Sequence, residues 1–147
     1  MQAGNGKITE LTNSLVDAKM NALEKVRVLS AWVFNNPEKR PVLGIPDALT
    51  TLNTRRGDCN EHTALFAAMA RNAGIPTRII AGVTFHEEAF YYHAWNEVCL
   101  DGSWLSLDTT KNHIPADVTH IKFVEGETSE QIKIGALLGR LKIEVVP

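Results

Sequence analysis

The stretch RGDCNEHTAL, residues 56–65, decides the fold, because it places a cysteine at the start of a helix. Asp58 is a favoured N-cap residue, and Glu61 stands three residues later, as a capping box requires. An apolar run rich in Ala, Leu and Met follows and stops at Gly74, a typical residue at a helix end. The sequence therefore predicts one largely buried helix with Cys59 at its first position.

Cys59 is a candidate nucleophile because of this position. Its sulfur is expected near unpaired backbone N–H groups and the positive end of the helix dipole, which both favour the thiolate. The charge of Asp58 acts the other way, and we expect the helix end and an imidazolium partner to outweigh it. Gly57 would allow a substrate backbone to approach closely. Taken alone, a buried inert cysteine is the more frequent outcome, so a second signal is needed.

The residues before this helix have a helical pattern as well. Apolar residues recur at three- and four-residue steps over residues 8–33, with weak breaks that allow one helix or two. Asn35-Asn36-Pro37 ends the run. A loop containing Pro and Gly is expected over residues 37–46 and a short helix over residues 47–52.

Beyond Gly74 the pattern changes from a helical period to an alternating one. The expected elements are strands at 77–85, 91–100, 103–108 and 121–124, a helix at 129–138 and a closing strand at 141–146. Helices first and an antiparallel sheet afterwards predict the α+β class.

The second signal comes from a predicted hairpin. Asp101-Gly102 is a strong two-residue turn signal, and counting outward from it sets Trp95 opposite Asp108. His93 lies two residues before Trp95, so it shares a face with Asp108, and such diagonal neighbours have Cβ atoms about 7–8 Å apart. A one-residue slip would separate them. The sequence thus predicts that a carboxylate orients the His93 imidazole, as in thiol acyl-transfer enzymes.

Composition and charge exclude several classes of protein. The 147 residues are 44% hydrophobic and 22% charged, which fits a single domain over residues 1–147. A net charge of -2 argues against a nucleic-acid binder or a polybasic membrane-surface protein. No apolar run is long enough to span a bilayer, and the start lacks a signal-peptide pattern. The start could equally be the edge of a longer protein, so the location stays open. Two cysteines are too few for a disulfide scaffold.

Four blocks of the sequence, in this order and with fitting gaps, resemble the core of the transglutaminase-like superfamily. They are the nucleophile block at 56–65, the Gly-Ile-Pro turn within 73–78, the His-Ala-Trp strand within 92–98 and the Trp-to-Asp strand within 102–110. The resemblance covers about residues 50–110, the motif-bearing core, with the N-terminal helices in the same lobe. Thr109 departs from the pattern, since the family commonly has Pro there.

The resemblance implies a papain-like fold in which N-terminal helices pack on an antiparallel sheet. It implies Cys59 as nucleophile, His93 as base and Asp108 as the orienting acid. We therefore expect acyl transfer on protein or peptide amides through a Cys59 thioester. Hydrolysis, as by a cysteine peptidase or amidase, is expected ahead of transfer to an amine, as by a transglutaminase. No cofactor is implied, and the chain lacks an evident calcium loop and flanking β-domains.

Other residues are candidates for lesser roles. The oxyanion would be held by the Cys59 N–H and one further donor. The candidates for oxyanion or substrate contacts are Asn53, Gly57, His62 and Trp95. The remaining histidines, at 86, 113 and 120, are expected to be surface residues in loops.

Two alternatives stay open. Cys59 and His62 could form half of a zinc site that His93 and Asp108 complete, although no second Cys/His pair lies near by. The chain could also be a non-catalytic interaction module of the same fold. The complete Cys, His and Asp set argues against a module, because binding alone has no need of all three.

Overall fold

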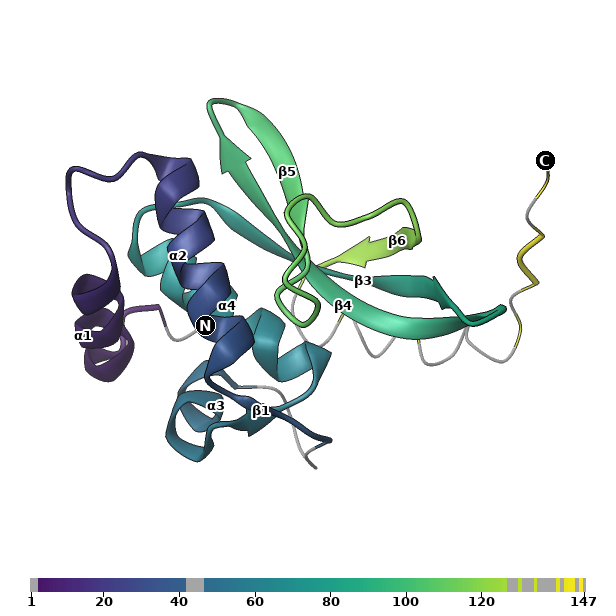
Figure 1. Cartoon of the computed structure of the whole chain (residues 1–147), viewed down its shortest axis with the longest axis horizontal. Coiled ribbons are helices and arrows are strands. Elements are labelled where there is room, and N and C mark those ends of the chain that lie inside the picture. The colour runs from purple at the N-terminus through teal and green to yellow at the C-terminus, as the bar shows by residue number, and fades with distance from the viewer. Residues whose placement is uncertain are drawn as a thin grey trace.

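The computed structural model describes residues 3–41, 47–126, 130, 134, 140, 142–144 and 146. These residues form helices in the N-terminal half and a four-stranded antiparallel sheet in the C-terminal half, which confirms the predicted α+β class. Figure 1 shows the helices gathered at one end of the molecule, with the long strands leading away from them. Within the described residues, no helix is long and apolar enough to cross a membrane.

The elements follow the predicted order closely. They are α1 (Gly6–Leu15), α2 (Ala22–Asn35), β1 (Glu38–Lys39), α3 (Ala48–Thr54), β2 (Arg56–Gly57), α4 (Cys59–Asn72), β3 (Thr77–His86), β4 (Ala89–Leu100), β5 (Ser103–Leu107) and β6 (His120–Glu125). The helix with Cys59 at its first position is therefore confirmed.

The first apolar run forms two helices because a cap divides it. The Asn21 side chain accepts the Glu24 N–H at 2.8 Å, and Glu24 Oε2 accepts the Asn21 N–H at 2.9 Å. This reciprocal capping box satisfies two otherwise unpaired donors. The weak break before residue 22 thus becomes a true helix start, and α1 and α2 both pack against α4.

The segment predicted as a loop at 37–46 contains a short strand. Within it, β1 pairs in parallel with β2, and the Glu38 N–H donates to the Arg55 carbonyl at 2.7 Å. The prediction missed β1 because two residues cannot display an alternating pattern. Residues 42–46 lie outside the described part of the chain.

The C-terminal predictions are only partly covered by the structure. The helix predicted at 129–138 lies almost entirely outside the described residues. The closing strand predicted at 141–146 is not found at its described residues, 142–144 and 146, and β6 takes the edge beside β3 instead. Alternation predicts which face of a strand is buried, but not which strand is its partner.

The sheet has the order β5-β4-β3-β6, and the β4–β5 hairpin has the predicted register. Asp101 and Gly102 both have positive φ, 50° and 81°, as a two-residue hairpin turn requires. The last ladder pair joins Asn96 to Leu107. Asp108 therefore leaves β5 at the position opposite Trp95.

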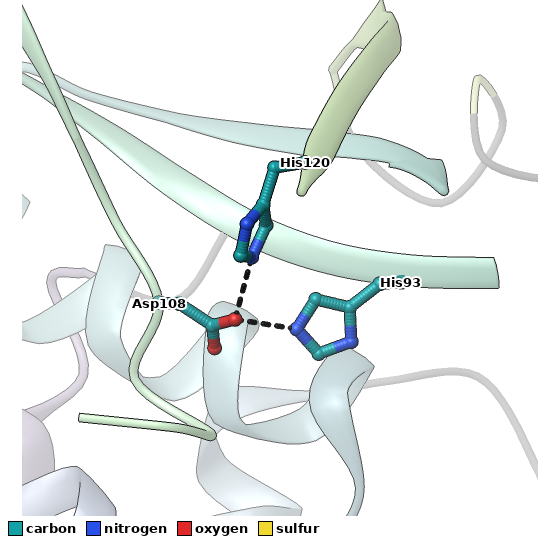
Figure 2. Close-up of side chains that lie close together, drawn as sticks. All are labelled: His93, Asp108 and His120. Carbon is teal, nitrogen blue, oxygen red and sulfur yellow. Dashed lines mark hydrogen bonds and ion pairs between the residues drawn. The ribbon is translucent and has the colours of Figure 1, made fainter. Parts of the chain in front are cut away.

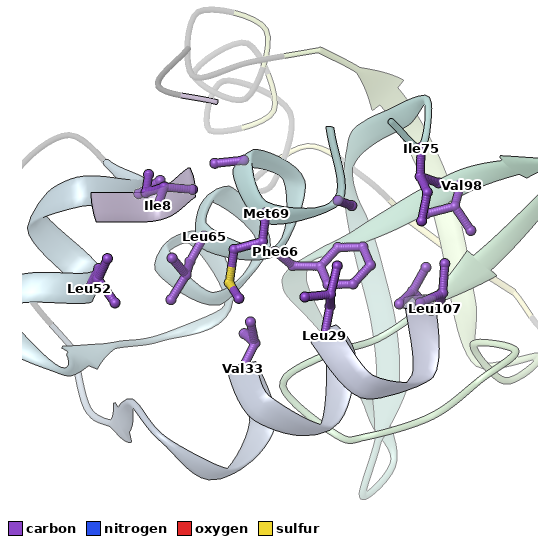
Figure 3. Packing of buried hydrophobic residues seen from close by; sticks show 14 residues of the cluster. Ile8, Leu29, Val33, Leu52, Leu65, Phe66, Met69, Ile75, Val98 and Leu107 are labelled. Atoms are coloured by element: carbon purple, nitrogen blue, oxygen red, sulfur yellow. The ribbon is translucent and has the colours of Figure 1, made fainter. Parts of the chain in front are cut away.

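The hydrophobic core lies between the helices and the sheet. Figure 3 shows Phe66 of α4 in a cluster that includes Leu29 of α2 and Val98 and Leu107 of the sheet. Each of these side chains is fully buried, which contributes about 1.5–3 kcal/mol per side chain. This packing fixes the helix that carries Cys59 against the strands.

The β6 strand approaches β3 closely at a bulge. The register shifts between Ala81 and Gly82, and a Cβ on Gly82 would lie only 2.0 Å from the Ile121 carbonyl oxygen. Only glycine permits this approach. Because a bulge re-aims the residues that flank it, Gly82 helps to set the position of His120 at the start of β6.

Candidate active site

The start of α4 is held by side-chain caps. The Asp58 carboxylate accepts the Asn60 N–H at 3.0 Å, and Glu61 Oε2 accepts the Asp58 N–H at 2.9 Å, so the predicted capping box is confirmed. Gly57 gives room to this cap, because a Cβ there would lie 2.2 Å from the Glu61 Cβ. In this structure it is therefore the Glu61 side chain, and not a substrate, that lies close to the Gly57 backbone.

Cys59 lies against the strand that carries His93. Its sulfur forms a hydrogen bond with the backbone of Ala94, the residue after His93. The Thr63 hydroxyl donates to the Cys59 carbonyl, and the Asn96 amide donates to the Thr63 carbonyl at 3.2 Å. These bonds tie the first turn of α4 to β4.

Burial raises the pKa of the Cys59 thiol to about 12, and the negative charge of Asp58 adds to this effect. The hydrogen bond with the Ala94 backbone acts in the opposite direction but is weaker. The expectation that the helix end and an imidazolium would lower this pKa is wrong for the resting site, because it left out the burial of the sulfur. Such a thiol needs a base to accept its proton when it attacks.

His93 and Asp108 make the contact predicted from the hairpin. His93 Nε2 lies 2.7 Å from Asp108 Oδ2, as Figure 2 shows. The other carboxylate oxygen accepts the backbone N–H groups of Thr110 at 3.0 Å and Lys111 at 3.2 Å. The turn after β5 thus fixes the carboxylate. Since Nε2 of His93 is engaged, Nδ1 is the ring nitrogen that remains for proton exchange.

Asp108 is an ionised carboxylate despite its complete burial. Burial by itself would raise the pKa of Asp108, but hydrogen bonds from His120 and His93 outweigh it and hold the pKa well below its usual range. A buried charge of this kind is tolerated because its oxygens are fully hydrogen-bonded.

His120 is the residue that the sequence analysis placed wrongly. Its Nε2 lies 2.8 Å from Asp108 Oδ2, on the same oxygen that His93 contacts (Figure 2), and its side chain is 4% exposed. The prediction of a surface residue failed because an edge strand after a long loop gives no signal of its register. His86 and His113 have exposed side chains, as predicted.

His62 lies beneath the helix start and not on a surface that a substrate could reach. Its side chain is fully buried, and Nδ1 lies 2.6 Å from the Asp58 carbonyl oxygen. Burial lowers the pKa of His62, so the ring is neutral at neutral pH and donates from Nδ1. His62 therefore supports the cap and is not available for substrate contact.

Asn53 and Trp95 lie in different environments. Asn53 is exposed on α3, where it accepts a hydrogen bond from Lys7 Nζ at 3.3 Å and borders a surface groove of about 510 Å³ beside α1. None of these contacts reaches Cys59. Trp95 is 3% exposed and stacks on the His93 ring, with 6.3 Å between centroids and 20° between planes. It packs against the His93 imidazole, and its role in substrate contact stays a prediction.

Tyr92 is a further neighbour of Cys59 that the sequence analysis missed. Its hydroxyl donates to Asn60 Oδ1 at 2.6 Å. Burial raises the pKa of Tyr92, and the negative charges of the Cys59 thiolate, when that forms, and of Asp58 add to this effect. The phenol is therefore a neutral donor beside the sulfur. The contact depends on how α4 packs on β4, which no local spacing reveals.

A metal is not needed to explain the cluster of His93, Asp108 and His120. Their donor atoms all lie within 4.8 Å of one another, close enough to surround an ion. However, Nε2 of His93 and Nε2 of His120 each already form a hydrogen bond with Asp108 Oδ2. The zinc alternative also required His62. Among the described residues, His62 is not a member of this cluster, and its Nδ1 bonds the Asp58 carbonyl oxygen.

Glu61→Gln is expected to stabilise the protein at pH 8 but not at pH 5. Burial raises the pKa of Glu61 to about 7 from an ordinary 4.5. The folded state then binds more protons than the unfolded state between these values, so stability falls as pH rises through this window. Gln keeps the oxygen that caps Asp58 and carries no charge. We expect a gain of about 1 kcal/mol at pH 8, or roughly 3 °C in Tm by calorimetry.

Glu10→Gln is the matched control, since Glu10 is an exposed acid on α1. Its Tm change is expected to be the same at both pH values. A Glu61→Gln effect that is equally independent of pH would contradict the role of burial.

Sequence comparison places this site in a family. The profile of the transglutaminase-like superfamily matches residues 9–109. The chain belongs to the transglutaminase-like superfamily. The matched segment contains Cys59, His93 and Asp108 and extends over the N-terminal helices, beyond the motif-bearing core read from the sequence. His120 lies outside it.

Two relatives with similar sequences are much longer than the chain. Kyphoscoliosis peptidase of Mus musculus is 28% identical over an alignment of 136 residues that covers 79% of this chain and 20% of the relative. The protein of the same name from Homo sapiens is 27% identical with the same coverage. The chain thus spans about one fifth of the length of these relatives.

Solved structures of the superfamily confirm the predicted papain-like fold. A candidate cysteine protease of Cytophaga hutchinsonii has a TM-score of 0.70 at 25% identity, over 85% of this chain and 43% of that chain. The periplasmic domain of TgpA from Pseudomonas aeruginosa has a TM-score of 0.58 at 27% identity, over 74% of this chain and 43% of that chain. Legionella pneumophila LapG, with a TM-score of 0.59 at 16% identity over 95% and 99% of the chains, shares the fold.

Proposed function

We propose that the chain catalyses acyl transfer at a protein or peptide amide through a thioester on Cys59, with water as the preferred acceptor. The observation that carries the proposal is the 2.7 Å contact between His93 and Asp108, on the strand whose Ala94 backbone bonds the Cys59 sulfur. A thiol, an imidazole and an orienting carboxylate are the parts that thiol acyl transfer requires.

The first half-reaction forms the thioester. His93 Nδ1 accepts the thiol proton as Cys59 Sγ attacks the amide carbonyl carbon. Asp108 holds Nε2 and stabilises the imidazolium that forms. The C–N bond then breaks, and the amine leaves with the proton from His93. The raised pKa of the thiol fits this order of events, because the proton is transferred only when the substrate is attacked.

The Cys59 N–H is suited to hold the oxyanion that forms during this attack. The Asp58 carboxylate caps the N–H groups of the next two residues, Asn60 and Glu61. Within the described part of the chain, no hydrogen bond uses the Cys59 N–H itself. A free N–H at a helix start next to the nucleophile can stabilise the negative oxygen.

The second half-reaction releases the acyl group. Water loses a proton to His93 and attacks the thioester carbon, the C–S bond breaks, and the sulfur takes the proton back. The product is a carboxylic acid. A primary amine in place of water would give a new amide, which is the transglutaminase reaction.

Product analysis tests the proposal. The chain is incubated with a peptide library that includes glutamine-containing members, with and without a primary amine, and products are measured by mass spectrometry. We expect acids from cleaved or deamidated peptides in both arms. Amide products as the main species would show that an amine is the preferred acceptor. No product in either arm, from folded protein, would contradict the proposal.

A further inference from the structure

His120 occupies a buried position between two carboxylates. Its Nε2 lies 2.8 Å from Asp108 Oδ2, and its Nδ1 lies 2.9 Å from Asp117 Oδ1. The side chain is 4% exposed. Figure 2 shows the ring directed at Asp108 Oδ2 from above, while His93 approaches the same oxygen from the right.

These contacts determine the charge of the His120 ring. An ionised carboxylate only accepts hydrogen bonds, and a neutral imidazole has only one N–H to donate. Asp117 Oδ1 also accepts the Thr119 N–H at 3.0 Å, as expected of an ionised oxygen. A neutral His120 would therefore present a lone pair to one of the two carboxylates, whereas the imidazolium satisfies both. In agreement, hydrogen bonds and charges from Asp108 and Asp117 raise the pKa of His120 against the lowering effect of burial.

Packing holds the His120 ring in this orientation. It meets Trp95 edge to face at 4.9 Å between centroids and the His93 ring at 5.6 Å. The backbone of His120 pairs with Thr84 of β3, next to the bulge at Gly82. The strand pairing fixes the backbone of His120, and the ring cannot turn away from Asp108 without breaking the contacts with Trp95 and His93.

We propose that His120 is a positively charged positioning residue that fixes the Asp108 carboxylate toward His93 and offsets its charge. The inference rests on the proposed function, in which His93 must be neutral to accept the thiol proton. An uncompensated Asp108 would favour the protonated His93 ring, and a second cation bonded to the same carboxylate oxygen reduces that effect. His120 would thereby keep the base active at lower pH.

The charged groups around His120 leave this reasoning intact. In the described residues, Asp108 and Asp117 face it from the loop after β5, and His93 faces it from β4. Lys111 Nζ bonds the Thr84 hydroxyl on β3 at 3.2 Å. Cys59 of α4 is neutral at rest, and the charge of Asp108 is among the effects that raise its pKa. Lys122, on β6 itself, is paired with Glu97 and Glu125.

The experiment compares pH profiles of kcat/KM for the whole chain and its variants. His120→Gln keeps a hydrogen-bond donor but removes the charge, so its acid limb is expected to move up by about one pH unit, which costs roughly tenfold in activity at pH 6 and much less at pH 8. Asp117→Asn is expected to move the limb in the same direction by a smaller amount. His113→Gln is the matched control, because His113 is an exposed histidine of the same loop, and its profile is expected to be unchanged.

A purely structural role for His120 would lower activity equally at all pH values. That result, or a profile identical to wild type, would overturn the proposal.

A second measurement does not depend on turnover. The ¹⁵N NMR signals of the His120 ring are expected to be those of an imidazolium at pH 7. A neutral ring at pH 7 would overturn the proposal even if the chain is active. If the His120 ring is an imidazolium but the chain has no activity, the proposed function is wrong and the charge assigned to His120 is still supported.

Discussion

Cys59→Ala is expected to fold like the wild type and to lose turnover by roughly 10⁴-fold or more. The sulfur is the only protein atom in the proposed mechanism that bonds to the acyl carbon, so its removal ends the reaction at the first step. The side chain is small and partly exposed, and its removal leaves the Asp58 cap and the Asn96 bond in place. The measurements are kcat/KM on a cleaved peptide and the Tm of both proteins.

Cys99→Ala is the matched control for this substitution. Cys99 is the second cysteine of the chain, is exposed to a similar degree and pairs with Trp104 on the neighbouring strand, away from the helix start. Its removal is expected to leave activity within about twofold of wild type. Full activity in Cys59→Ala, or equal losses in the two variants, would show that the thiol at the helix start is not the nucleophile.

His93→Ala is expected to lose nearly as much activity as Cys59→Ala. With a raised pKa, the thiol has no route to lose its proton unless the imidazole accepts it. Because the two residues act as a unit, the double variant is expected to be no worse than either single variant. The measurement is a double-mutant cycle in kcat/KM.

Asp108→Asn provides a graded comparison in the same cycle. It keeps an oxygen near His93 but loses the charge that stabilises the imidazolium, so its loss is expected to be smaller than that of His93→Ala. Losses that simply add in the double variant of Cys59 and His93 would indicate that these side chains do not share one step.

Local signals in the sequence were sufficient to predict the helix start and the hairpin. A capping box depends only on residues three apart, so Asp58 and Glu61 predict it from the sequence. A two-residue turn at Asp101-Gly102 fixes the register of its strands, and this register brings His93 to Asp108. Both features rest on short-range geometry that neighbouring residues determine.

Features that depend on long-range packing were not predictable in the same way. His120 follows Asp108 by twelve positions and reaches it through an edge strand whose register is set by the bulge at Gly82. The burial that raises the pKa of Cys59 depends on how α4 lies against β4. Neither the length of a loop nor the alternation of a strand specifies such contacts. Local patterns in the sequence therefore predict the candidate base and acid but not the charge environment around them.

The most direct test of the central claim is to find where the acyl group is attached during turnover. A reaction with a cleaved peptide is quenched in acid, digested and mapped by tandem mass spectrometry. The acyl mass is expected on the peptide that contains Cys59, and it is expected to be absent from His93→Ala treated in the same way. An acyl group on Cys99, or turnover without any acyl group on Cys59, would contradict the mechanism.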